Sequence, residues 1–93
     1  MLESDDAPIA ILADPQNSNV SVAGIKRALM GRKVRELRQK LGMSRQEFAE
    51  AYGIPLMSIR QYEIGRYMPP RAIRAYLRVI EAEPEKVRRV IEG

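Results

Sequence analysis

The sequence predicts an all-α protein, a compact bundle of about five short helices preceded by a flexible N-terminal arm. From residue 21 onward, apolar residues recur at three- and four-residue spacing, which is the period of a helix buried on one side. Glycines and prolines divide this pattern into short segments. No stretch alternates β-branched and polar residues, so no sheet is expected.

The first 20 residues differ in composition from the rest and are predicted to be a flexible acidic arm, followed by one helical domain over residues 21–93. Prolines, Asn and Ser disfavour regular structure there, and the apolar stretch "IAIL" is too short to build a core. Residues 1–24 contain four acidic residues and no Lys or Arg. The arm is expected to stay outside the core, where "IAIL" could add to a neighbouring chain.

A helical pattern is predicted between residues 21 and 42. Ser21 is a candidate N-cap, because its hydroxyl can accept a hydrogen bond from the first turn. Gly31 has low helix propensity, so the helix is expected to kink or restart there. Gly42 is a candidate left-handed residue at the helix end. The apolar positions on either side of Gly31 are Val22, Ile25, Leu29, Met30, Val34, Leu37 and Leu41.

Two shorter helices follow. "SRQE" predicts a capping box in which Ser44 and Glu47 bond to each other's backbone N–H groups. Gly53 ends this helix, because glycine adopts a positive φ at little cost. The next helix is predicted over residues 55–64, with its proline in the first turn and Gly65 at its end. The inner face of the first of these helices is expected at Phe48, Ala49 and Tyr52.

Two further helices complete the predicted domain. Pro70 is placed to open the first, and Glu83 is a weak cap before Pro84 at the first position of the second. The buried face of the first is expected at Ile73, Tyr76, Leu77 and Ile80. Val87, Val90 and Ile91 of the second are expected to point inward.

Composition excludes several classes of function. The chain has no Cys and no His, so it has no thiolate metal site and lacks the commonest general base and metal ligand. We therefore expect no enzyme activity, no cofactor and no metal. No apolar run is long enough to span a membrane and no signal peptide is evident, so a cytoplasmic protein without membrane contact is expected.

Charge is distributed unevenly along the chain. The net charge is +4, but residues 25–93 contain all sixteen basic and only eight acidic residues, which gives +8 for this part. A solvated surface explains this excess as well as a polyanionic partner does. Charge alone leaves both interpretations open.

The helices that flank Gly53 have the spacing of a helix-turn-helix, since about three residues with a glycine separate them. The small Ala49 allows close crossing of the two helices, and Ile59 can fill the angle between them. These positions explain folding only, because an ordinary helical hairpin would have them too.

The outward-facing stripe of the helix predicted over residues 55–64 carries side chains that can form specific hydrogen bonds and apolar contacts. It consists of Leu56, Met57, Arg60 and Gln61. In a major groove, Gln can bond adenine and Arg can bond guanine, each pair contributing about 1–3 kcal/mol of discrimination, while Leu and Met can contact thymine methyl groups. Alternatively, the two apolar residues pack on a neighbouring helix or a dimer partner and the two polar ones are solvated.

From about Val34 to Leu77 the chain, with "LRQKLGMSRQEFAEAYGIPLMSIRQYEIGRYMPP", resembles the lambda-repressor-like helix-turn-helix family, which includes phage repressors and regulators of toxin–antitoxin operons. The resemblance implies a bundle of about five helices that binds operator DNA as a dimer. It places base reading at Leu56, Met57 and Gln61, with Arg60 beside them. It places phosphate contacts at Ser44, Arg45, Arg66 and Tyr67.

The resemblance also implies a buried ion pair between Arg38 and Glu63. The chain departs from the family pattern at three positions. Arg45 stands where members usually have Gln, Tyr62 where Trp is frequent, and Ile64 where a polar residue is common. We therefore expect Ile64 to face a partner.

The leading hypothesis is a sequence-specific DNA-binding transcriptional regulator, in the first place a repressor, that binds double-stranded DNA as a homodimer. Lys40 and Arg71 join Arg45 and Arg66 as candidates for phosphate contacts. The alternative is an antitoxin-type protein that binds a partner toxin through its N-terminal arm and regulates its own operon.

Overall fold

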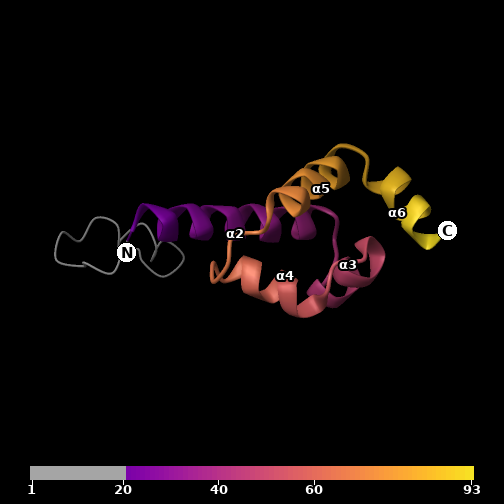
Figure 1. Ribbon diagram of the computed structural model, residues 1–93. Helices are drawn as coiled ribbons and strands as arrows, with labels where there is room; N and C mark the ends of the chain where they lie inside the picture. Colours follow the sequence, from indigo (N-terminus) through magenta and orange to yellow (C-terminus); the bar gives the residue numbers. More distant parts are fainter. Residues whose placement is uncertain (1–20) are drawn as a thin grey trace.

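The computed structural model describes residues 21–93, which form five helices and no strand (Figure 1). The all-α prediction is therefore confirmed. The arm predicted over residues 1–20, and the toxin contact that the antitoxin alternative assigns to it, lie outside the described residues. The helices are α2 (Val22–Lys40), α3 (Arg45–Tyr52), α4 (Leu56–Glu63), α5 (Arg71–Ala82) and α6 (Pro84–Glu92).

Helix α2 is continuous over 19 residues, so the predicted kink or restart at Gly31 is wrong. Ser21 caps its start, since the Ser21 Oγ accepts a hydrogen bond from the Gly24 N–H at 3.0 Å. Gly31 is buried, and a Cβ added there would lie 2.5 Å from the carbonyl oxygen of Tyr62 and 2.7 Å from that of Glu63. The glycine thus permits close approach of the end of α4, while strong helix formers on both sides of it keep α2 helical.

The predicted ends of the shorter helices are largely present. The capping box forms, with Ser44 Oγ accepting from the Glu47 N–H at 3.1 Å and Glu47 Oε1 accepting from the Ser44 N–H at 2.8 Å. Pro55 and Pro70 stand at the N-cap positions of α4 and α5, just before the first helical residue. Pro84 is at the first helical position of α6, as predicted.

The core lies where α2, α3, α4 and α5 meet. The rings of Phe48 and Tyr52 pack with their centroids 5.1 Å apart. Tyr76 of α5 donates a 2.7 Å hydrogen bond from its hydroxyl to the Tyr52 carbonyl, and Tyr52 donates its own to the Pro84 carbonyl at 3.1 Å. The buried apolar side chains are Val34, Leu37, Phe48, Ala49, Tyr52, Ile54, Ile59, Leu77 and Ile80.

Helix α6 is attached at the edge of this core. Val87 is half-buried and packs against the core, as predicted. The inward orientation predicted for Val90 and Ile91 is wrong, because their relative exposures are 72% and 45%. A short helix at the end of the chain meets α3 and α5 along one side only, so its remaining apolar residues stay in contact with solvent. None of the described helices is both long and apolar enough to cross a membrane.

Candidate nucleic-acid interface

The turn between α3 and α4 consists of Gly53, Ile54 and Pro55. Gly53 has φ 71°, in the left-handed region that favours glycine. The N–H groups of Gly53 and Ile54 both bond to the Ala49 carbonyl, at 2.9 and 3.1 Å. Ala49 and Ile59 are buried at the angle between the two helices. The side chains that the sequence predicted for this corner thus hold α3 and α4 in a helix-turn-helix arrangement.

The end of α4 is held against α2 by its backbone carbonyls. Arg27 donates from Nε to the Gly65 carbonyl at 3.0 Å, and Arg35 donates from Nη1 to the Glu63 carbonyl at 3.5 Å. Cations are favourable there because the last carbonyls of a helix carry partial negative charge. Together with the contact at Gly31, these bonds restrict the position of α4 on α2.

A buried carboxylate lies beneath the ends of α3 and α4. Glu63 is 5% exposed, and the pair that the resemblance implied with Arg38 is present. Arg38 donates from Nε and Nη2 to the two carboxylate oxygens at 2.8 and 3.0 Å. The hydrogen bond to Glu63 raises the pKa of Arg38 above its ordinary value, although burial acts in the opposite direction. Arg38 thus neutralises the buried carboxylate of Glu63 through two hydrogen bonds.

Arg45 joins the same carboxylate, which the sequence did not predict. Its Nε donates to Glu63 Oε1 at 3.0 Å, and its side chain is 46% exposed. Both terminal nitrogens of Arg45 lack hydrogen bonds to other described residues. Arg45 is thus bound at one edge of its guanidinium group and has two N–H₂ groups left for an external anion such as a phosphate.

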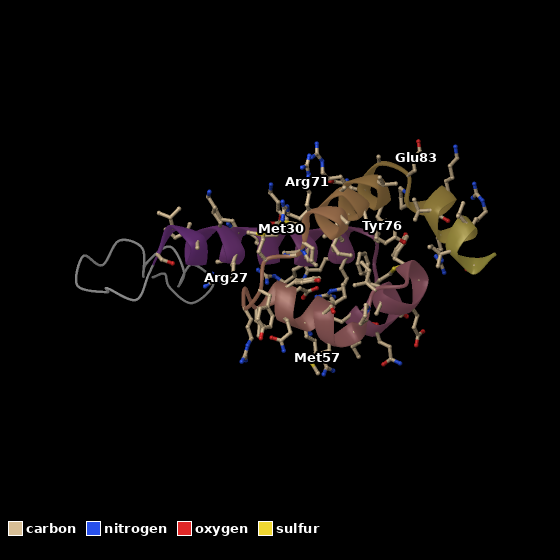
Figure 2. All side chains as sticks on the ribbon, in the orientation of Figure 1. Arg27, Met30, Met57, Arg71, Tyr76 and Glu83 are labelled. Atoms are coloured by element: carbon tan, nitrogen blue, oxygen red, sulfur yellow. The ribbon has the colours of Figure 1, made fainter. Side chains whose placement is uncertain are left out.

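The outer edge of α4 presents three of the predicted base-reading side chains. Met57 is 58% exposed, Arg60 is exposed, and Gln61 is half-buried beside Met57. Figure 2 shows Met57 on the side of α4 that faces away from α2. Leu56, predicted for the same stripe, is half-buried and packs against the core instead. It lies in the first turn of α4, close to the turn that joins α4 to α3.

The amide of Gln61 is incompletely bonded within the protein. Its Nε2 donates to the sulfur of Met57 at 3.5 Å, and its Oε1 is buried without a partner among residues 21–93. A buried polar atom without a hydrogen bond costs about 1–3 kcal/mol. The edge of adenine offers a donor for Oε1 in its amino group and an acceptor for the second N–H of Nε2 in its N7.

The candidate phosphate-binding residues fall into two groups. Ser44, at the start of α3, uses its Oγ as an acceptor in the capping box, so its hydroxyl hydrogen can still be donated. Arg66 and Tyr67 follow α4 and are exposed, with the guanidinium carbon of Arg66 5.8 Å from the ring centroid of Tyr67. Both groups lie at the ends of the helices that form the corner.

The structure separates Arg71 and Lys40 from these residues. Figure 2 shows Arg71 and Met57 on opposite sides of the molecule. Lys40 lines a groove between α2 and α5. The residues that sequence reasoning missed are Gly31, Arg27 and Arg35, which fix α4 on α2. An isolated glycine among strong helix formers was the available signal, since such a glycine usually has a packing reason.

Comparison with known families identifies one match. Residues 29–90 match a family model described as Helix-turn-helix domain. No curated protein and no solved structure matches the chain significantly. The matched segment includes α3, α4, the turn between them and all of α5, together with most of α2 and of α6.

Proposed function

The chain belongs to the helix-turn-helix domain family, and from this premise we propose that it is a sequence-specific DNA-binding transcriptional regulator that reads operator DNA with α4. The family supports a DNA-binding regulator in general. The observation that carries the specific proposal is the outer edge of α4, where Met57, Arg60 and Gln61 lie together on a helix that is fixed to α2 by its far end.

Base reading follows from the chemistry of this edge. Helix α4 has eight residues and is thus about 12 Å long, close to the width of the major groove of B-DNA. Arg60 would donate two hydrogen bonds to the O6 and N7 of guanine, and Gln61 would bond adenine through both amide atoms. Met57 would lie against a thymine methyl group.

Phosphate contacts would set the position of α4 along the groove. We assign them to Ser44 and Arg45 before α4 and to Arg66 and Tyr67 after it. Arg71 and Lys40 are left out of this interface because they lie elsewhere on the molecule. Each cation that neutralises a phosphate releases counterions, so affinity would fall steeply as salt concentration rises.

We further propose that two copies bind a two-fold symmetric operator and repress transcription, in keeping with the resemblance to repressors. Half-sites about 34–36 Å apart would place two copies of α4 in successive turns of the major groove. Ile64 at the end of α4 and Val90 in α6 are among the most exposed apolar side chains, and they are the candidates for the contact between copies.

Selection of bound sequences from random DNA, followed by affinity measurements on the selected site, tests the proposal. The double variant Arg60→Ala with Gln61→Ala is expected to lose about tenfold or more in affinity for that site, since each base contact is worth about 1–3 kcal/mol. Its binding to unrelated DNA should change far less, because phosphate contacts dominate nonspecific binding.

Arg89→Ala is the matched control, because Arg89 is exposed on α6, away from the corner. It should leave the affinity for the selected site almost unchanged. If the double variant bound that site as well as the natural chain does, base reading by α4 would be wrong. If selection enriched no sequence, the protein would not be a sequence-specific regulator.

A further inference from the structure

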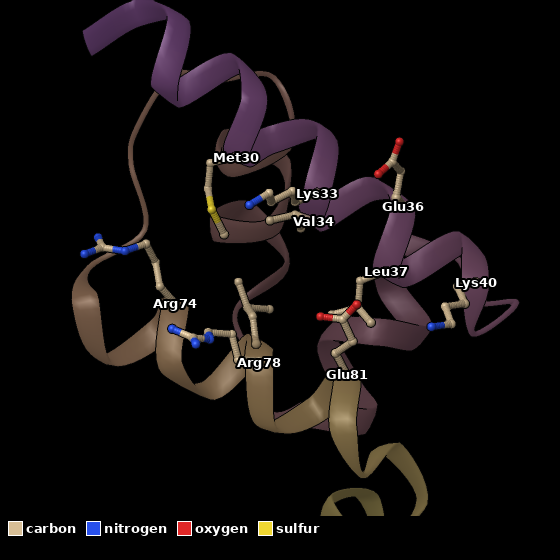
Figure 3. Close-up of a pocket in the computed structure, with 10 residues that line it drawn as sticks. Met30, Lys33, Val34, Glu36, Leu37, Lys40, Arg74, Arg78 and Glu81 are labelled. Atoms are coloured by element: carbon tan, nitrogen blue, oxygen red, sulfur yellow. The ribbon is translucent and has the colours of Figure 1, made fainter. Parts of the chain in front are cut away.

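A groove of about 760 Å³ lies between α2 and α5 (Figure 3). It is as large as pockets that enclose small-molecule ligands. Its apolar lining consists of Met30, Val34, Leu37 and Leu77, and its charged lining of Lys33, Glu36, Lys40, Arg74, Arg78 and Glu81. The groove thus combines an apolar floor with a charged rim, and four of the six charges are positive.

The rim has an excess of uncompensated positive charge. Glu36 is already shared with Arg32 of its own helix, at 3.7 Å. Among residues 21–93 no ion pair joins α2 to α5 across the groove. Lys33 and Lys40 on one wall and Arg74 and Arg78 on the other outnumber Glu36 and Glu81, so the rim carries a net charge of +2 and its four cations repel one another. An acidic occupant would relieve this repulsion and let the two walls approach.

The groove is separate from the candidate nucleic-acid interface. Figure 1 shows α4 and α5 on opposite sides of α2. The groove is lined by α2 and α5 alone, and none of the residues that the proposed function assigns to base or phosphate contacts lines it. A segment bound there would leave the outer edge of α4 open, so occupation of the groove does not depend on DNA binding.

We propose that this groove is the docking site for the N-terminal segment of the same chain, residues 3–14. This segment, "ESDDAPIAILAD", has the complementary composition. Its four carboxylates, without a single Lys or Arg, match the positive rim. Its "IAIL" stretch matches the apolar floor. The two features of the segment thus correspond to the two features of the groove.

Chain length permits this docking within one molecule. The groove begins near Met30, about 12 Å along the helix axis from the start of α2 at Val22, and ends near Lys40, about 27 Å from it. Residues 13–20, when extended, span at most about 26–29 Å. "IAIL" at residues 9–12 therefore reaches the groove if the chain turns back along α2, and residues 3–6 reach its far end.

Docking in the groove would give the four acidic residues of the N-terminal segment a defined binding site. Without such a place, the acidic segment is attracted to every cationic surface within reach, including Arg45, Arg60 and Arg66 at the corner. Docked in the groove, it neutralises the rim and leaves those arginines to a polyanion. It also fills the space between α2 and α5.

A spin label tests this docking in the full chain. Because the chain has no cysteine, Ala7→Cys carries a single nitroxide label. The expected result is loss of NMR amide signals for Lys33–Lys40 and Arg74–Glu81, with signals for Met57–Gln61 retained. Equal loss of amide signals from the groove and from α4, or signal loss confined to the start of α2, would overturn the proposal.

Charge reversal supplies the matched comparison. Lys33→Glu with Arg78→Glu is expected to restore the lost signals, whereas Lys86→Glu with Arg89→Glu, which changes net charge equally on exposed positions of α6, should not. When Asp5 and Asp6 are also changed to Lys in the Lys33→Glu, Arg78→Glu variant, the amide signals should be lost again, because the charges are then complementary once more. The proposal would be wrong if both double variants behaved alike.

Mixing separates docking within one chain from exchange between chains. Spin-labelled chains of natural isotope abundance are mixed with ¹⁵N-labelled chains that carry no spin label. Unchanged signals in the mixture are expected when each segment docks on its own molecule. Signal loss in the mixture would show that the segment binds a second copy, and would overturn docking within one chain.

Discussion

The two sides of α2 are packed in different ways. On one side, α4 is so close that Gly31 has no room for a Cβ, and three arginines of α2 bond to atoms near the end of α4. On the other side, a groove separates α2 from α5, and no ion pair between described residues crosses it. Both α4 and α5 are amphipathic helices, yet within residues 21–93 it is the backbone of α4 that closely approaches α2, at Gly31, while the groove lies between α2 and α5.

The difference follows from what holds each helix. Helix α4 is held by backbone contact and by charged hydrogen bonds, which have narrow geometric requirements. Helix α5 is held mainly by apolar packing and by the hydrogen bond from Tyr76 to the end of α3, and apolar packing is not directional. Directional contacts with α2 are thus concentrated on the helix that we propose to read DNA, where small displacements would cost base contacts.

The largest loss of folding stability is expected from Glu63→Gln, on the side of α2 that packs closely against α4. The change leaves Arg38 and Arg45 facing a neutral group in a buried site, and breaking such a pair costs about 3 kcal/mol. Urea denaturation measures the loss. Glu36→Gln is the control, because Glu36 forms an exposed pair with Arg32 at 3.7 Å. This variant should lose little stability. Equal effects at the two positions would show that the buried cluster does not hold α4.

A somewhat smaller effect is expected from Gly31→Ala. The new Cβ would meet backbone atoms of α4, which cannot rotate away, and overpacking of this kind costs about 1–3 kcal/mol. The higher helix propensity of Ala, about 1 kcal/mol, offsets part of this. The variant should therefore lose both stability and affinity for the selected operator.

Gly24→Ala tests the interpretation of Gly31. Gly24 lies in the same helix, and its added Cβ would meet only side-chain atoms, the nearest being Ser21 Oγ at 3.3 Å. Stability should stay the same or rise in this variant. If Gly31→Ala also raised stability, the close approach of α4 to α2 would not be a constraint.

On the open side, Tyr76→Phe is expected to cost about 1 kcal/mol, because it removes the hydrogen bond to the Tyr52 carbonyl. Burial raises the pKa of Tyr76 and of Tyr52 above the ordinary value. Their contribution to stability is therefore complete below about pH 10 and is lost as pH rises through the higher pKa of the folded state.

Unfolding measured between about pH 8 and pH 11 checks this prediction, since the interval includes the ordinary pKa of tyrosine. The natural chain should lose stability at the alkaline end. Tyr76→Phe should show a shallower decline, because one of the two buried hydroxyls no longer titrates. An unchanged decline would mean that Tyr76 does not contribute to it.

The smallest effect is expected at the surface of α6. Arg88 and Glu92 form an exposed pair at 3.7 Å, and exposed pairs contribute about 0–1 kcal/mol. Glu92→Gln should change the free energy of unfolding by less than about 0.5 kcal/mol, because Glu at the end of a helix also opposes the helix dipole. A loss comparable to that of Tyr76→Phe would mean that α6 is held mainly by charge.

Much of the fold could be predicted from local patterns. The capping box at Ser44 and Glu47, the turn at Gly53 and the buried Ile59 all follow from residues a few positions apart. The pair between Arg38 and Glu63 came from the family resemblance, and the structure contains it. The outward positions of Val90 and Ile91 could not be predicted, because the same spacing describes a helix in a core and one at its edge.

The sequence by itself determined where helices begin and end, because caps, glycines and prolines act over one turn of chain. It also determined which side of α4 carries Arg60 and Gln61. Only the tertiary structure decided that Gly31 serves contact between helices, that Arg45 shares the carboxylate of Glu63, and that α5 stands apart from α2. These features depend on distances between segments remote in the chain, which spacing along one helix does not encode.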